Sequence, residues 1–384
     1  MSAAAPGLQW LRTGQEIFPA MLAAIDAARE SVRLEIYIYA DGKIGREFRD
    51  ALVNAVQRGV RVFVLVDALG SWLLPGAYFA PLIAAGGSVR FFNPLRLWRF
   101  GVRDHRKLLV CDGQTAFIGG FNVADEYNGD GIHSGWCDFG LRLNNPALAG
   151  ALAASFDELF AIADFRRRPL LRLRAFKRKR KARVLPANMP LWNQPGPAPS
   201  PLRTALHHDL ARARDIRIMT AYFLPVRKLR RDLLRAARGG ARVRLIVAGK
   251  TDVLVAQLAA RSLYRQLLLA GVEIYEYQPQ ILHAKLVVAD RAAYVGSANF
   301  DVRSLKLNYE LMVRFDDETV VAAARAVFDD ALPHCRKIEL AAWRASQSFW
   351  QRWQQHWAHF LLARLDVICA LRQFQALGKN RTVQ

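Results

Sequence analysis

One polar motif occurs twice in this 384-residue sequence, and it contains the residues best suited to chemistry. Each copy reads His-x-Lys-x4-Asp and is followed by Gly-x-x-Asn. The histidine, lysine and aspartate spacing alone would occur roughly 0.01 times in a random chain of this composition. The two copies contribute, in chain order, His105, Lys107, Asp112 and Asn122, and then His283, Lys285, Asp290 and Asn299.

These residue types together suit the transfer of a phosphoryl group. Lysine ammonium and asparagine amide groups can donate hydrogen bonds to the non-bridging oxygens of a phosphate. One imidazole can attack phosphorus and form a phosphohistidine, while the second protonates the departing alcohol oxygen. We therefore predict that both His-Lys-Asp sets are catalytic and that Asn122 and Asn299 bind the substrate phosphate. We expect no metal ion and no other cofactor.

The spacing also predicts the elements that position these residues. On a strand, a histidine and a lysine two residues apart project from the same face. Asp112 and Gly113 then mark a hairpin turn, after which the returning strand brings Asn122 beside His105. We count the two motif aspartates among the catalytic residues, although a place at a turn favours a scaffold role. Glu310 either fixes the tautomer of a histidine or is an ordinary polar strand residue.

Three further pairs of segments are similar in the two halves of the chain. They are 32–39 and 216–223, 55–66 and 236–247, and 85–94 and 270–279. Each half thus alternates helices and buried strands in the same order. This repeat predicts an α/β fold of two similar lobes, each with a mostly parallel or mixed sheet flanked by helices. A pseudo-two-fold axis would relate the lobes and place the active site between them.

Composition divides the chain into four parts. We expect lobe 1 at 1–165, a basic and proline-rich linker at 166–201, lobe 2 at 202–335 and a tryptophan-rich tail of amphipathic helices at 336–384. Eleven basic and no acidic residues lie between 166 and 183, which is typical of a solvated segment or of an interfacial helix on anionic lipid. In the tail, Trp350, Trp353 and Trp357 follow helical spacing. They suit either packing on a lobe or a position at headgroup depth.

The overall composition limits the possible partners. Lys and Arg number 55 against 33 Asp and Glu, so the net charge of +22 predicts attraction to nucleic acid or to an anionic membrane surface. A hydrophobic fraction of 52% excludes a disordered basic protein. The four cysteines form no C-x-x-C pair, and no apolar run is long enough to span a bilayer. Because the charge is concentrated in the linker and the tail, it favours a membrane surface over nucleic acid.

The motifs resemble those of the phospholipase D superfamily, whose members carry two such His-Lys-Asp motifs between two α/β lobes. The resemblance covers about residues 8–335. Within the superfamily, four segments look most like bacterial cardiolipin synthases: 34–39, 117–122, 296–304 and 307–310. The first copy departs from the pattern at Gly120, where the second has Ser297, and it lacks the Asn-x-Glu that ends in Glu310. Asp138 is our candidate for the missing carboxylate.

The resemblance implies a phosphatidyl transferase that makes cardiolipin from two phosphatidylglycerol molecules. By analogy, His105 is the nucleophile and His283 the general acid, with Glu310 and Asp138 in support. It also implies a peripheral position on the cytoplasmic face of the bacterial inner membrane. The alternatives are a phospholipase D-type hydrolase or a nuclease, which share the same catalytic residues. A non-catalytic membrane or nucleic-acid binder with this fold is a further alternative of another class.

Overall fold

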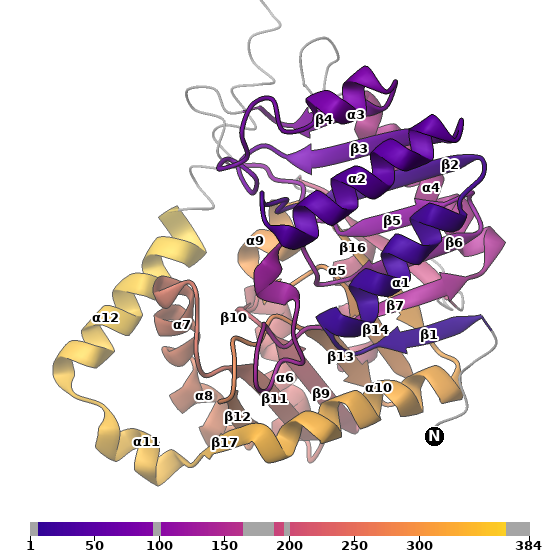
Figure 1. Cartoon of the computed structure of the whole chain (residues 1–384). Helices are drawn as coiled ribbons and strands as arrows, with labels where there is room; N and C mark the ends of the chain where they lie inside the picture. The colour runs from indigo at the N-terminus through magenta and orange to yellow at the C-terminus, as the bar shows by residue number, and fades with distance from the viewer. Residues whose placement is uncertain (1–6, 95–100, 164–187, 196–199, 366–384) are drawn as a thin grey trace, which may run out of the picture.

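The computed structural model describes residues 7–94, 101–163, 188–195 and 200–365 (Figure 1). The basic run predicted at 166–183 lies outside the described residues, as does the end of the tail from 366 onwards. The described chain forms two large sheets, each built by one half of the sequence. Among the residues described, no helix is both long and apolar enough to cross a membrane.

The first sheet has seven strands in the order β1-β7-β6-β5-β2-β3-β4. Strands β2, β3 and β4 are parallel, and all other neighbours are antiparallel. The sheet is therefore mixed, as the helix–strand alternation predicts. The strands are β1 (Leu8–Leu11), β2 (Ser31–Ile36), β3 (Arg61–Asp67), β4 (Ser88–Phe92), β5 (Leu108–Cys111), β6 (Thr115–Gly119) and β7 (Gly140–Asn144).

The second sheet repeats this order and adds one strand, giving β17-β12-β11-β9-β13-β14-β16-β8. Strands β9, β11 and β12 are parallel, as their counterparts in the first sheet are. The fold class is thus confirmed: two similar α/β lobes. The strands are β8 (Met189–Asn193), β9 (Asp215–Thr220), β11 (Arg242–Ala248), β12 (Glu273–Tyr277), β13 (Lys285–Ala289), β14 (Ala292–Gly296), β16 (Glu310–Phe315) and β17 (Cys335–Ile338).

Strand β8 corrects the predicted linker at 166–201. It pairs with β16 at the sheet edge, which is the position that β1 holds in the first sheet. The second repeat therefore begins before residue 202, inside the proline-rich segment. Proline is tolerated there because an edge strand leaves one side of its backbone unpaired, and Pro190 lies in β8. At the other end, β17 extends the second sheet beyond the predicted boundary at 335.

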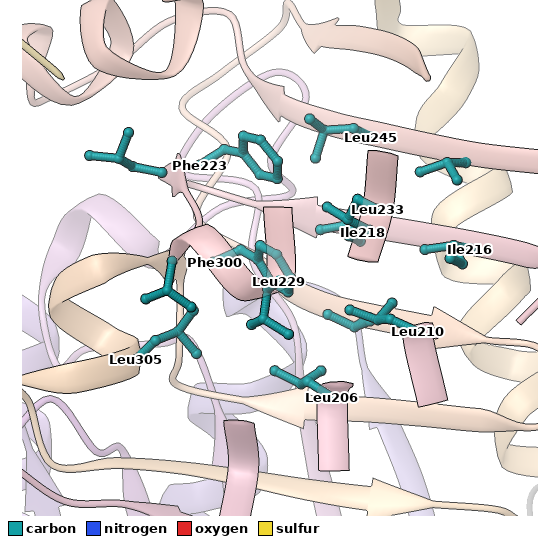
Figure 2. Packing of buried hydrophobic residues seen from close by; sticks show 14 of the residues in the cluster. Leu206, Leu210, Ile216, Ile218, Phe223, Leu229, Leu233, Leu245, Phe300 and Leu305 are labelled. Carbon is teal, nitrogen blue, oxygen red and sulfur yellow. The ribbon is translucent and has the colours of Figure 1, made fainter. Parts of the chain in front are cut away.

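Helices cover both outer faces of the pair of sheets and fill the space between them. The helices are α1 (Gly14–Ala27), α2 (Lys43–Gln57), α3 (Ala80–Ala84), α4 (Pro146–Ala161), α5 (Pro201–Leu210), α6 (Arg227–Arg238), α7 (Leu254–Arg261), α8 (Tyr264–Leu269), α9 (Val302–Lys306), α10 (Glu318–Ala331), α11 (Leu340–Ser346) and α12 (Phe349–Phe360). Figure 1 shows α1, α2 and α3 on the outer face of the first sheet. Figure 2 shows leucines of α5 and α6 packed on β9 and β11 at the outer face of the second.

A third apolar core joins the lobes. It contains buried residues of α4 and α10 together with inner-face residues of both sheets. Two short strands, β10 (Phe223–Leu224) and β15 (Phe300–Asp301), pair with each other in parallel. They follow β9 and β14 along the chain. Because burial of apolar area is the main favourable term in association, this shared core holds the two sheets in a fixed relation.

The described part of the tail after β17 is mainly helical, and one face of α12 packs on lobe 2. Helix α12 begins with a capping box at Ser348 and lies against α7, with Gln355 and Ala358 buried (Figure 1). Its opposite face carries Trp350 and Trp353, which are 68% and 49% exposed. The packing interpretation is confirmed for one face of α12, and a position at headgroup depth stays a prediction for the opposite, aromatic face.

Candidate active site

Each motif histidine lies in an extended segment that leads into a central strand. His105 and Lys107 come just before β5, and His283 comes just before β13, which begins at Lys285. The sequence predicts these residues within the strands, so their position differs by a few residues. The reason is that the backbone before each strand pairs with the opposite lobe instead of with its own sheet.

This pairing between the lobes is nearly symmetric. The N–H of His105 donates to the carbonyl oxygen of Tyr309 at 3.0 Å, and the N–H of Tyr309 donates to the carbonyl of Arg103 at 2.9 Å. On the other side, the N–H of His283 donates to the carbonyl of Cys137 at 2.8 Å, and the N–H of Cys137 donates to the carbonyl of Ile281 at 2.9 Å. The residue after Tyr309 is Glu310, and the residue after Cys137 is Asp138.

Each histidine therefore receives a carboxylate from the opposite lobe. His105 Nδ1 lies 3.0 and 3.1 Å from the two carboxylate oxygens of Glu310. His283 Nδ1 lies 2.7 Å from Asp138 Oδ2. Both carboxylates are buried, and an acceptor at Nδ1 fixes the proton there and leaves Nε2 for chemistry. We call these two pairs the crossed dyads.

The two dyads differ in one detail that explains a departure noted in the sequence. Ser297 Oγ donates to Glu310 Oε2 at 2.5 Å, whereas the corresponding residue of the first lobe is Gly120. A Cβ atom at Gly120 would lie 2.3 Å from both carboxylate oxygens of Asp138. Serine is therefore excluded at this position because the aspartate occupies the space of its side chain.

The motif lysines lie beside the histidines. Lys107 Nζ donates to the carbonyl oxygen of His105 at 2.8 Å. Lys285 Nζ lies 2.8 Å from His283 Nδ1 and also donates to the carbonyl oxygen of His283. Burial, and then the charge of Lys285, lower the pKa of Lys107 to about 7. Burial likewise lowers the pKa of Lys285 to about 8, against the opposing effect of the buried carboxylates.

Burial dominates the electrostatics of the other groups as well. It lowers the pKa of both histidines well below the ordinary value, and the lysine charges lower it further. It raises the pKa of Asp138 and of Glu310 to about 7, although the lysines oppose this shift. An anion placed between the two lysines would relieve their mutual repulsion and favour their charged forms. The two lysines therefore suit an anionic ligand such as a phosphate.

A cavity of about 360 Å³ lies at this site, and neither the two lysines nor the two carboxylates are among its lining residues. Both histidines line it, and so do Asn122 and Asn299. Asn122 Nδ2 donates to the hydroxyl of Tyr127 at 2.7 Å, and that hydroxyl lies 3.4 Å from His283 Nε2. Asn299 Oδ1 is buried and has no hydrogen-bond partner within the described chain, so this side chain is available to a ligand.

Several lining residues were not singled out from the sequence. Tyr37 packs edge-on against His105 with ring centroids 4.8 Å apart, and Tyr127 and Trp136 pack against His283 at 5.2 and 5.5 Å. Arg303 also lines the cavity. Tyr37 and Arg303 had a visible signal, because they belong to the segments 34–39 and 296–304 that resemble the family. The aromatic residues do not occur at matching repeat positions.

Asp112 and Asp290 lie at the hairpin turns, where their carboxylates bind backbone N–H groups, and this favours the scaffold role over the catalytic one. The Asp112 carboxylate accepts hydrogen bonds from the N–H groups of residues 29, 30 and 31, at 2.8 to 3.3 Å. Asp290 accepts from those of Arg214 and Asp215 in the same way. Both have positive φ at the hairpin turn, 53° and 45°. Burial tends to raise the pKa of Asp112, but these backbone hydrogen bonds hold it below the ordinary value. Each aspartate thus links its hairpin turn to the backbone of a neighbouring segment by hydrogen bonds.

Two α/β lobes that bring two histidines to one cavity, each held by a carboxylate of the opposite lobe, define a protein of the phospholipase D superfamily. The family described as "Cardiolipin synthase, PLD-like domain" matches residues 21–160 and 206–332. The chain belongs to this family and is a cardiolipin synthase-like phosphatidyltransferase.

Known relatives agree with this assignment. Cardiolipin synthase 1 of Bacillus anthracis is 33% identical over 349 residues, which cover 88% of this chain and 68% of that protein. Cardiolipin synthase B of Escherichia coli (strain K12) is 33% identical over 320 residues, covering 81% and 76%. The crystal structure of phosphatidylserine synthase from Haemophilus influenzae Rd KW20 matches with a TM-score of 0.74 over 97% of this chain and 96% of that one. At 16% identity, this last likeness concerns the fold.

Proposed function

We propose that this protein makes cardiolipin from two phosphatidylglycerol molecules through a phosphohistidine intermediate. The observation that carries the proposal is the pair of crossed dyads on one cavity. Two histidines, each with Nδ1 held by a carboxylate, can act on the same phosphorus atom in different roles. The 33% identity to cardiolipin synthases supports the choice of phospholipid as substrate.

In the first step, Nε2 of His105 attacks the phosphorus of one phosphatidylglycerol. The bond from phosphorus to the headgroup glycerol breaks, and His283, which in this state carries a proton on Nε2 as well as on Nδ1, gives the Nε2 proton to the departing glycerol oxygen. Glu310 stabilises the positive charge that develops on His105 as the nitrogen–phosphorus bond forms. Free glycerol leaves, and a phosphatidyl group remains on His105.

In the second step, a headgroup hydroxyl of another phosphatidylglycerol gives its proton to His283. Its oxygen attacks phosphorus, the nitrogen–phosphorus bond breaks, and cardiolipin is released with both histidines restored. Lys107, Lys285 and Asn299 bind the non-bridging oxygens and stabilise the charge of the transition state. Asp138 holds His283 in the orientation needed for both proton transfers.

We further propose that the protein works at an anionic membrane surface, on the cytoplasmic face of the bacterial inner membrane. The support is the aromatic face of α12, where Trp350, Trp353, Trp357 and Phe360 follow one another at ring-centroid distances of 5.8 to 6.1 Å. Indole side chains favour the headgroup region, and a net charge of +22 attracts anionic lipid.

The test is to incubate the purified protein with phosphatidylglycerol vesicles and to separate the lipids. We expect cardiolipin and glycerol in equal amounts, and neither product from His105→Ala or His283→Ala. The matched control is His133→Ala, which removes an exposed histidine paired with Asp130. Phosphatidic acid without cardiolipin would identify a hydrolase, and cutting of DNA would identify a nuclease. A protein inert toward lipid and nucleic acid alike would be a binder.

A further inference from the structure

We propose that a second, strongly basic cavity holds the headgroup phosphate of an anionic phospholipid that does not react. The cavity measures about 1040 Å³ and lies between α5, α6, α9 and α12 of lobe 2. It is separate from the catalytic cavity, although Leu224 and Val302 line both. This inference concerns membrane binding and holds whichever phosphodiester the active site cleaves.

The lining of this cavity is cationic and contains no acidic residue. His207, which lines the cavity, pairs with the buried carboxylate of Asp232 at 2.5 Å. Within the part of the chain that the structure describes, no ion pair joins Arg227, Arg230 or Lys306 to an acidic side chain. The cations that line the cavity are Arg203, Arg227, Lys228, Arg230, Arg231 and Lys306.

These cations are crowded at a cost in the absence of an anion. Burial, and then the charges of Arg203 and Arg227, lower the pKa of Lys306. Burial and Arg227 lower the pKa of Arg230 in the same way. Helix α6 also begins at this cavity, with its N-cap Val226 offering no side-chain hydrogen bond, so its N-terminal dipole adds to the positive potential. A phosphate group is the ligand whose charge and oxygen acceptors compensate this arrangement.

The position of α12 identifies the phosphate as that of a lipid. His356, His359 and Phe360 of this helix form one wall of the basic cavity, while Trp353 and Trp357 lie on its exposed face. A helix with tryptophans at headgroup depth brings the cavity beside it to the level of the lipid phosphates. Figure 1 shows α12 at the edge of the molecule beside α7, with one flank open. Duplex nucleic acid, which is bound mainly through its phosphates, would need no such aromatic surface.

The experiment compares two double variants of the same helix with equal loss of charge. Arg227→Gln with Arg230→Gln removes two cations from the cavity, whereas Arg235→Gln with Arg238→Gln removes two exposed cations of α6 that do not line it. Binding of the full chain is measured on vesicles of phosphatidylcholine alone and of equal parts phosphatidylcholine and phosphatidic acid. Phosphatidic acid has no headgroup alcohol to transfer, so this readout does not depend on turnover.

We expect the cavity variant to bind the phosphatidic acid vesicles about 30-fold more weakly, and the control variant at most about threefold more weakly. Lys306→Gln, from α9, gives a second variant with a smaller loss in the same direction. Equal losses in the two double variants would reduce the effect to net charge and overturn the proposal, as would no loss in either. Thermal stabilisation by inorganic phosphate that the cavity variant abolishes, without any change in vesicle binding, would assign the site to a soluble anion and also overturn it.

Discussion

Replacement of Lys107 by methionine should make the protein more stable and inactive. Lys107 is 3% exposed, and its pKa is about 7 where an ordinary lysine has 10.5. The difference corresponds to about 5 kcal/mol of folding free energy that the buried ammonium costs at neutral pH. Methionine has a similar length and no charge, so it removes this cost.

Part of the gain is lost with the contacts of the ammonium group. The hydrogen bond to the carbonyl of His105 contributes about 1 kcal/mol, whereas the attraction to Glu310 and Asp138 is already included in the pKa of about 7. We therefore expect a net stabilisation of about 4 kcal/mol at pH 7, equivalent to roughly 6 °C in the thermal midpoint of unfolding. Transfer activity should fall by about 10³-fold or more, because a donor to the phosphate oxygens is lost.

The pH dependence gives a sharper readout. An unfolded lysine keeps its proton up to about 10.5, whereas folded Lys107 releases it above about 7. The wild-type protein is therefore destabilised below this range and gains stability as pH rises from about 7 toward 10.5. The advantage of Lys107→Met should shrink over the same interval. Inorganic phosphate should stabilise the wild-type protein more than the variant.

The control is Lys43→Met, which removes a lysine whose side chain is 75% exposed. It should change the thermal midpoint little at any pH, because an exposed ion pair contributes little. If Lys107→Met unfolds at a lower temperature than the wild-type protein at pH 7, the buried ammonium stabilises the fold. The electrostatic account of the site would then be refuted.

Four further substitutions test other parts of the structure. Glu310→Gln and Asp138→Asn should each lower kcat by about 10² to 10⁴-fold and alter the acidic limb of the pH–rate profile, with little change in KM; an unchanged profile would mean that the carboxylates only fill space. Asp112→Ala should lower the free energy of unfolding by about 1 to 3 kcal/mol and leave kcat/KM nearly intact, because it removes acceptors for three backbone N–H groups. This destabilisation should vanish as the pH falls below the pKa of an ordinary aspartate. A large loss of kcat at full stability would return Asp112 to the catalytic set. Trp353→Ser should weaken vesicle binding about tenfold without affecting turnover of a detergent-dispersed substrate, and equal binding would exclude α12 from the membrane contact.

The repeated order of strands could be predicted from the sequence because each half carries the same alternation of apolar and polar residues. The internal similarity of 55–66 and 236–247 corresponds to β3 and β11, which hold equivalent positions in the two sheets. Strand β8 could not be predicted in the same way. Its sequence contains Pro190, and an edge strand with one paired side needs no strong apolar pattern.

The catalytic pairs show a different limit. The motif residues identify both histidines, and Glu310 and Asp138 were recognisable as carboxylates that could support them. Which carboxylate serves which histidine depends on the backbone pairing of Tyr309 and of Cys137 with the opposite lobe. Contacts between the lobes leave no period in the sequence, so neither the crossing nor the aromatic wall at Trp136 could be derived from it.

The crossed dyads make each lobe a half-site that gives one carboxylate and accepts another. Two identical lobes joined by a two-fold axis would complete each other in the same manner, so the single chain has the architecture of a symmetric dimer fused end to end. A dimer of identical subunits must carry the same carboxylate on both sides. In a single chain the two sides can differ. One side has Glu310 with Ser297, and the other has Asp138 with Gly120.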